Sequence, residues 1–75
     1  MRVESIKELL EATPFLPFTV HQPDRPAMHV PHPDFAHLSP KGKTIHVWTE
    51  NGEGFRILDV ALITDLEPDQ PSRQG

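Results

Sequence analysis

The sequence predicts a mostly β fold of the α+β class, in which an N-terminal helix precedes a five-stranded, antiparallel, partly closed small barrel. Three observations predict it. One short segment has helical periodicity, several short segments alternate apolar and polar residues, and nine prolines and four glycines interrupt the chain. At 75 residues the chain is shorter than an average domain, so one domain is the maximum. We expect this domain to span residues 1–67 and a flexible tail to span residues 68–75.

The helix is predicted at the N-terminus, where apolar residues recur at steps of three and four with charged residues between them. Pro14 and Pro17 lack the amide hydrogens that a continuing helix needs, and Thr13 is disfavoured in the α region because it precedes a proline. We therefore expect the helix to end near Ala12. The apolar stripe consists of Val3, Ile6, Leu9 and Leu10.

A β-hairpin is predicted next. Residues 18–21 and 28–30 alternate apolar and polar side chains, and the turn-forming segment 22–27 separates them. Residues 31–40 contain three prolines, which cannot donate to a strand ladder, so an ordered loop is expected there with Phe35 and Leu38 as its anchors in the core.

The second half of the chain predicts another hairpin. Residues 44–49 form the clearest strand by alternation and β-branched content, and residues 55–58 form the returning strand. Asn51-Gly52 between them is typical of a tight turn in which both residues have positive φ. Residues 59–62 are expected to form a single turn and residues 63–66 the last strand.

Composition excludes several kinds of site. The chain has no cysteine, which removes disulfides, thiolate zinc sites, iron–sulfur clusters and thiol catalysis. Its net charge is −4, and its seven Lys and Arg residues are scattered, which disfavours a phosphate-binding surface. The N-terminus alternates charged and apolar residues, unlike a signal peptide or a membrane span. We therefore expect a cytoplasmic protein with no membrane partner.

Three motifs resemble those of a family of short, uncharacterised bacterial proteins. They are Pro-Phe-Leu-Pro-Phe at 14–18, His-Pro-Asp-Phe at 32–35 and Leu-Ile-Thr-Asp-Leu-Glu at 62–67. The resemblance covers residues 8–67 and implies no function. Where that family turns its first hairpin on Asp-Gly-Arg, this chain has Asp-Arg-Pro at 24–26.

The order of elements is also similar to the Sm-like fold, a small barrel of the SH3-like kind. This similarity implies RNA binding and rings formed through edge strands, but fold alone does not imply function. The RNA-contacting residues of Sm-like proteins have no clear match here, and Asn51-Gly52 is interpreted as a hairpin turn.

The histidines give the main candidate site. If Val20 pairs with Val30, His21 and His29 lie opposite each other on the exposed face of the first hairpin. Burial of the apolar residues at 45 and 47 turns the intervening side chains outward, and a residue between Phe55 and Ile57 points outward likewise. The alternative is that these are ordinary solvent-facing strand residues. The predicted partner-binding surface consists of His21, His29, His46, Trp48 and Arg56.

A metal site is the second candidate, formed by His29, His32, Asp34 and His37. The spacing matches no recognised zinc pattern, and histidines three residues apart in an extended chain point to opposite sides. The alternative is that His32 forms local hydrogen bonds and Asp34 caps a turn. We therefore assign no metal and no cofactor.

No catalytic residues are assigned either, because the serines and threonines lie in no nucleophile motif and the glycines form no phosphate loop. The sequence predicts a non-enzymatic protein-interaction module that self-associates as a homo-oligomer or binds another protein, since so short a chain gains stability from burying a further face. The alternative is an Sm-like RNA-binding barrel, which the net charge disfavours.

Overall fold

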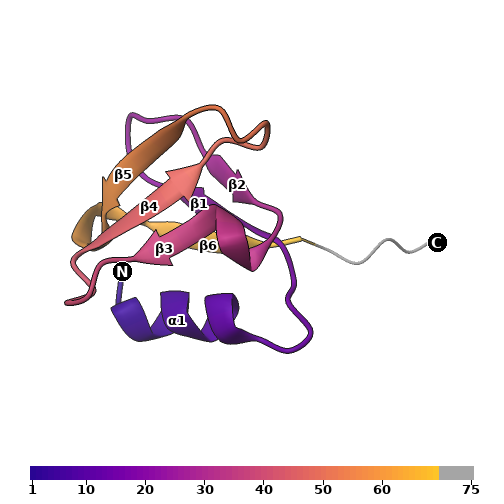
Figure 1. Cartoon of the computed structure of the whole chain (residues 1–75). Helices are drawn as coiled ribbons and strands as arrows, with labels where there is room; N and C mark the ends of the chain where they lie inside the picture. Colours follow the sequence, from indigo (N-terminus) through magenta and orange to yellow (C-terminus); the bar gives the residue numbers. More distant parts are fainter. Residues whose placement is uncertain (70–75) are drawn as a thin grey trace.

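The computed structural model describes residues 1–69, which form one helix and six strands arranged in two antiparallel sheets (Figure 1). One sheet has the strand order β2-β1-β6 and the other β3-β4-β5. Two 3-10 helices, η1 (Pro33–Phe35) and η2 (Val60–Leu62), connect strands. The remaining elements are α1 (Val3–Glu11), β1 (Phe18–His21), β2 (Met28–Val30), β3 (Ala36–Leu38), β4 (Thr44–Trp48), β5 (Phe55–Asp59) and β6 (Asp65–Pro68).

The α+β class is confirmed, but the five-stranded, partly closed barrel is not. β6 pairs with β1, and β3 pairs with β4, so the strands form two separate three-stranded sheets. Among residues 1–69 no strand ladder joins one sheet to the other. The structure is therefore two facing sheets with a shared core and not a closed barrel.

One strand was not predicted at all. This strand, β3, lies inside the segment that we expected to be a loop. Pro33 and Pro40 limit its length but do not prevent it, because residues 36–38 contain no proline and pair with β4. The expected anchors Phe35 and Leu38 do pack against the core, while Ala36 is the residue that is fully buried.

The core fills the space between the two sheets. Phe18, Val20, Val30, Ile45 and Val47 are at most 1% exposed, and they alternate with outward-facing residues along their strands. Burial of each side chain of this size contributes about 1.5–3 kcal/mol relative to exposure. These residues hold the two sheets against each other.

The helix covers one end of this core, below the strands in Figure 1. Ile6 is completely buried, and the other three residues of the predicted stripe pack partly buried against the core. The backbone turns extended at Ala12, where the sequence predicted the helix to end.

The β4–β5 hairpin is confirmed, but its expected tight turn is wrong. β4 ends at Trp48 and β5 begins at Phe55, so six residues connect them. Gly52 has a φ of +76°, and it alone has positive φ in this loop. Asn51 shapes the loop through its side-chain oxygen, which accepts hydrogen bonds from the Thr49 hydroxyl at 2.6 Å and the Glu53 amide at 2.9 Å.

The end of the described chain also differs from the prediction. The single turn is present as η2, but the last strand runs over 65–68 instead of 63–66. The Asp69 amide donates to the Pro17 carbonyl at 2.8 Å, so ordered contacts continue past residue 67. Residues 70–75 of the predicted flexible tail lie outside the described residues.

Gly42 allows the loop before β4 to approach the helix. Its φ is +72°, and a Cβ placed there would lie 2.9 Å from Cγ2 of Val3. Gly52 has nearly the same φ, +76°, but a Cβ there would meet nothing within 4 Å. The two glycines thus share a backbone constraint and differ in their surroundings.

We expect Gly52→Ala to lower the free energy of unfolding by about 1 kcal/mol, because alanine is strained at positive φ. Gly42→Ala should lower it further, because Val3 must also move. Urea unfolding followed by Trp48 fluorescence measures both. The excess loss should shrink in a Val3→Ala background, and equal losses for the two glycines would contradict the close contact.

Candidate interaction face

The side of the β3-β4-β5 sheet that faces away from the core carries the candidate site. Ile45 and Val47 are fully buried, so the alternate residues of β4 point away from the core. The strand register then sets which neighbours join them. It aligns His37, His46 and Ile57 in one row across the sheet, and Trp48 with Phe55 in the next. We call these five residues the aromatic–histidine face.

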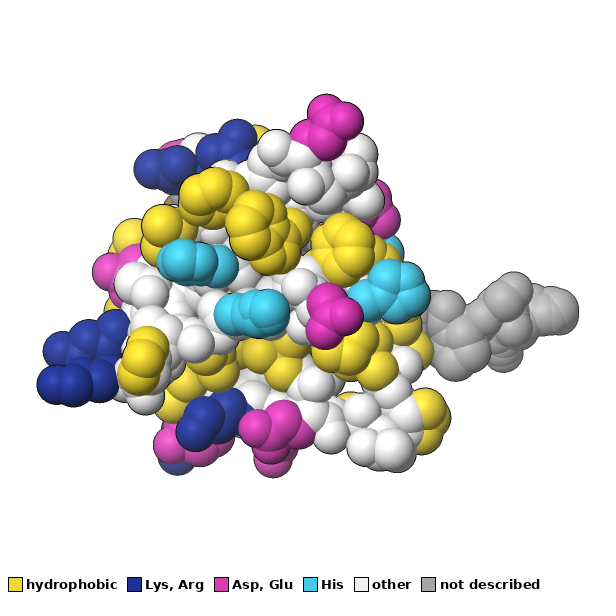
Figure 2. Space-filling view, viewed as in Figure 1, with side chains coloured by type: hydrophobic (Ala, Val, Ile, Leu, Met, Phe, Trp, Pro, Cys, Tyr) yellow, Lys and Arg dark blue, Asp and Glu magenta, His cyan; other side chains and the backbone are white. Residues whose placement is uncertain are grey.

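This face has a large exposed apolar component. Phe55 is 52% exposed and Ile57 56% exposed, while Trp48 is half-buried. The Trp48 and Phe55 rings meet edge to face with centroids 4.8 Å apart, and the His46 and Phe55 rings are 6.0 Å apart. Figure 2 shows hydrophobic and histidine side chains side by side over these strands, with Lys and Arg toward the margin.

The face has little charge. Asp59 lies on the same side of the sheet at its far end, and its carboxylate accepts a hydrogen bond from the Ala61 amide at 2.9 Å. Arg56 pairs with the buried Val47 and so lies on the other side of β5, where it is exposed because β5 is an edge strand. Among the described residues of β3, β4 and β5, no Lys or Arg lies on this side of the sheet.

The structure separates the five residues of the predicted surface. His46 and Trp48 lie together on the aromatic–histidine face, and Arg56 lies on the opposite side of its strand. His21 and His29 belong to the other sheet. The two histidines are not opposite each other either. His29 pairs with Thr19, two residues before His21 in β1.

Phe55 and Ile57 complete the face, but they were expected on the inner side of β5 because Arg56 between them was expected to point outward, and this expectation is wrong. Phe55 and Ile57 form one apolar set, and Leu58 and Val60 form the other. The sequence alone contains no signal that decides which set is buried. The register with β4 decides it, since Leu58 pairs with buried Ile45.

His29 connects three segments that are distant in sequence. Its Nδ1 lies 2.7 Å from the Glu50 carboxylate in the β4–β5 loop, and its Nε2 lies 3.1 Å from the Asp69 carboxylate after β6. Carboxylates only accept hydrogen bonds, so this geometry suits the doubly protonated ring. The pKa of His29 is raised, mainly by the hydrogen bond to Glu50; burial is the next-largest effect and lowers it, and the hydrogen bond to Asp69 raises it by less.

His29 also lies beside the face. Together with Trp48 and Glu50 it lines a shallow hollow of about 220 Å³ between β2 and the end of β4. The contacts of His29 therefore help to position the loop next to Trp48.

The four residues considered as candidate metal ligands do not come together. Among residues 1–69 no group of three or more His, Asp and Glu side chains is placed to hold a metal ion. His37 lies on the aromatic–histidine face, His29 is held by two carboxylates, and the His32 ring packs 5.9 Å from that of Phe35.

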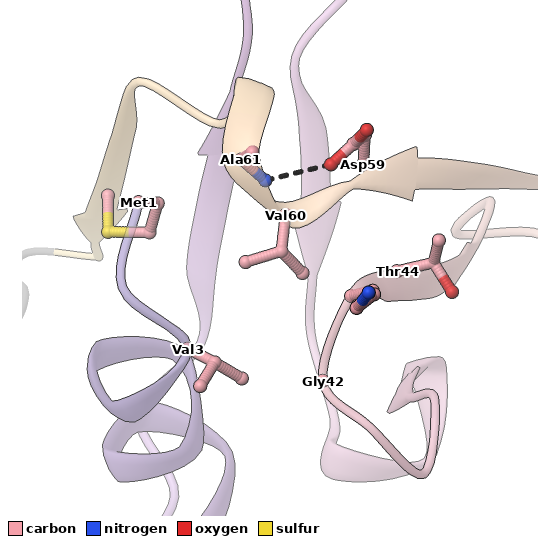
Figure 3. Close-up of a pocket in the computed structure, with 8 residues that line it drawn as sticks. Met1, Val3, Gly42, Thr44, Asp59, Val60 and Ala61 are labelled. Carbon is pink, nitrogen blue, oxygen red and sulfur yellow. Dashed lines mark hydrogen bonds between the residues drawn. The ribbon is translucent and has the colours of Figure 1, made fainter.

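A larger hollow, of about 610 Å³, lies between the start of α1 and the end of the β4–β5 hairpin. In Figure 3, Met1 and Val3 lie on one side of it, with Gly42 and Thr44 across from them and Val60 between. Its lining is mainly apolar, and the Asp59 carboxylate is engaged by the Ala61 amide. Lys43 and Asp59 are the two charged residues of its lining.

Comparison with known proteins gave no match to any family model, curated protein or solved structure. Within residues 1–69 no helix has the length and apolar character needed to cross a bilayer.

The His29 contacts make a specific prediction for stability. A histidine whose pKa is raised on folding stabilises the fold below its unfolded pKa of 6.5, and this stabilisation is lost as pH rises through the folded pKa. Because Glu50 and Asp69 are partly in solvent, the contribution is about 0.5–1 kcal/mol.

We therefore expect His29→Gln to lower the free energy of unfolding more at pH 6 than at pH 8.5, as measured by urea titration. His32→Gln is the matched control, since no carboxylate contact is recorded for His32 among the described residues. A pH-independent loss for His29→Gln would show that the carboxylates do not bind its charged form.

Proposed function

We propose that the protein is a non-enzymatic protein-interaction module that self-associates through the aromatic–histidine face. The observation that carries the proposal is the exposure of Phe55 and Ile57, each more than half exposed, next to Trp48. Contiguous apolar patches on small proteins often mark binding surfaces, and Trp is among the residues that most often anchor them.

The charge distribution leaves the aromatic–histidine face as the surface through which a second copy of the chain can bind. The protein carries 11 acidic and 7 basic residues, so two copies repel each other over most of their surface. The five residues of the aromatic–histidine face include no Asp, Glu, Lys or Arg, so two such faces can meet without repulsion between side chains of these types.

The size of the face predicts a weak complex. With an aromatic or large aliphatic side chain contributing up to about 200 Å², the exposed part of the five residues amounts to roughly 400 Å². A standard stable interface buries about 800 Å² per partner. We therefore expect reversible association that is seen only at high protein concentration.

Binding of single-stranded RNA is the second candidate, because bases can stack on exposed aromatic rings such as those of Trp48 and Phe55. The face lacks Lys and Arg, however, and neutralisation of phosphates supplies most of the affinity for nucleic acid. Fluorescence anisotropy with single-stranded RNA at low salt tests this candidate, and salt-sensitive binding that Phe55→Thr weakens would favour it.

For self-association we expect sedimentation equilibrium at neutral pH to show a concentration-dependent dimer that Ile57→Thr weakens at least tenfold. Threonine keeps the β-branched shape but adds a hydroxyl that must be desolvated in the interface. Leu16→Thr is the matched control, because Leu16 is 40% exposed and lies between α1 and β1, outside this sheet. A wild-type monomer at millimolar concentration, or equal weakening by both substitutions, would contradict the proposal.

A further inference from the structure

Two histidines lie at the middle of the aromatic–histidine face. His37 of β3 and His46 of β4 are directly opposite each other in the antiparallel ladder. Residues paired in this way have Cβ atoms about 5 Å apart. When both rings are charged they repel each other, and when both are neutral each offers one donor and one acceptor.

The surroundings of these two histidines differ from those of His21 and His29 on the other sheet. His21 lies 2.9 Å from the Glu67 carboxylate, and His29 contacts two carboxylates. Among residues 1–69 neither His37 nor His46 lies within salt-bridge distance of a carboxylate. A proton gained by either of these rings therefore has no recorded partner of opposite charge.

The groups around His46 come from both neighbouring strands. His37 faces it from β3, and Ile57 and Phe55 face it from β5. The carboxylate nearest in the register is Asp59, one pair away on the same side, which already binds the Ala61 amide. His37 is thus the titratable group that directly faces His46.

A partner that covers the apolar part of the face must also cover His46. His46 pairs with Ile57, and Trp48 is the next residue of β4 on the same side of the sheet. The His46 ring also lies next to that of Phe55. Burial of an imidazolium without a counter-ion is costly, whereas a neutral imidazole can hydrogen-bond to the partner.

We propose that His37 and His46 make self-association acid-sensitive, so that proton uptake by these rings separates the copies while each copy stays folded. This inference rests on the proposed function, and it assigns the regulation of the same face. If one proton must be released when the face is buried, the association constant falls by up to about tenfold for each unit by which the pH is lowered. One such proton from each of two copies gives up to about a hundredfold per pH unit.

Sedimentation equilibrium at pH 7.5 and pH 5.5 tests the proposal on the full chain. We expect the dissociation constant of the wild type to rise at least tenfold at the lower pH, and that of the His37→Gln/His46→Gln double variant to change little. The control His21→Gln should keep the wild-type response, because His21 lies on the other sheet. Far-UV circular dichroism at both pH values checks that the monomers remain folded.

The outcomes separate this inference from the proposed function. Association that is equal at both pH values, or an acid response that the double variant retains, would overturn the inference and leave the interaction module standing. A wild-type monomer at every pH would overturn both.

If the double variant fails to associate, NMR titration of the His46 ring in the wild type decides the matter. Linkage requires that its titration midpoint fall as protein concentration rises, since dimerisation disfavours the charged ring. A midpoint independent of concentration, under conditions where the dimer forms, would overturn the inference.

Discussion

The burial of Ile45 and Val47 is the constraint on which the β3-β4-β5 sheet depends. Both side chains are completely buried between the two sheets, so β4 has no freedom to slip by one residue. A slip of one residue would place His46 in the core and Ile45 in solvent, at a cost of several kcal/mol. The outward orientation of His46 and Trp48 follows from the packing of their neighbours and needs no separate stabilisation.

The same constraint gives β5 its unusual exposure. Leu58 pairs with Ile45 and is buried, while Arg56 pairs with Val47 on the same side of the sheet yet reaches solvent at the sheet edge. A charged side chain on the inner side of an edge strand discourages pairing with a further strand. At β5 the edge is thus protected, whereas Phe55 and Ile57 leave the outer surface apolar. This arrangement favours contact through the face of the sheet over extension of the sheet.

Much of the fold could be predicted from local signals. The helix, the two hairpins and the single turn follow from periodicity, proline positions and β-branched content. The strand β3 could not be predicted, because its three residues acquire their extended pairing from β4 and lie between prolines that are typical of a loop. The separation of the sheets depends on the pairing of β1 with β6, whose partners are more than 40 residues apart.

The candidate site was only half predictable for the same reason. Alternation along the clear strand β4 identified His46 and Trp48, but membership of Phe55 and Ile57 depends on how β5 aligns with it. The six-residue loop between the strands hides that alignment, since the Asn51-Gly52 pair suggests a shorter connection. The contacts of His29 with Glu50 and Asp69 likewise join segments that no local pattern relates.

The histidines of the two sheets have different surroundings, and this difference bears on how the molecule responds to acid. On the β2-β1-β6 sheet, His21 and His29 contact carboxylates, and the raised pKa of His29 shows that its charged form is stabilised in the folded chain. On the other sheet, protonation of His37 and His46 places two like charges side by side without a recorded carboxylate partner among the described residues. As long as the carboxylates remain ionised, mild acid thus favours the contacts that join β2 to the β4–β5 loop, while under the proposed regulation it disfavours burial of the face. Because the fold depends on the core and the proposed association depends on the face, the loss of one does not require the loss of the other.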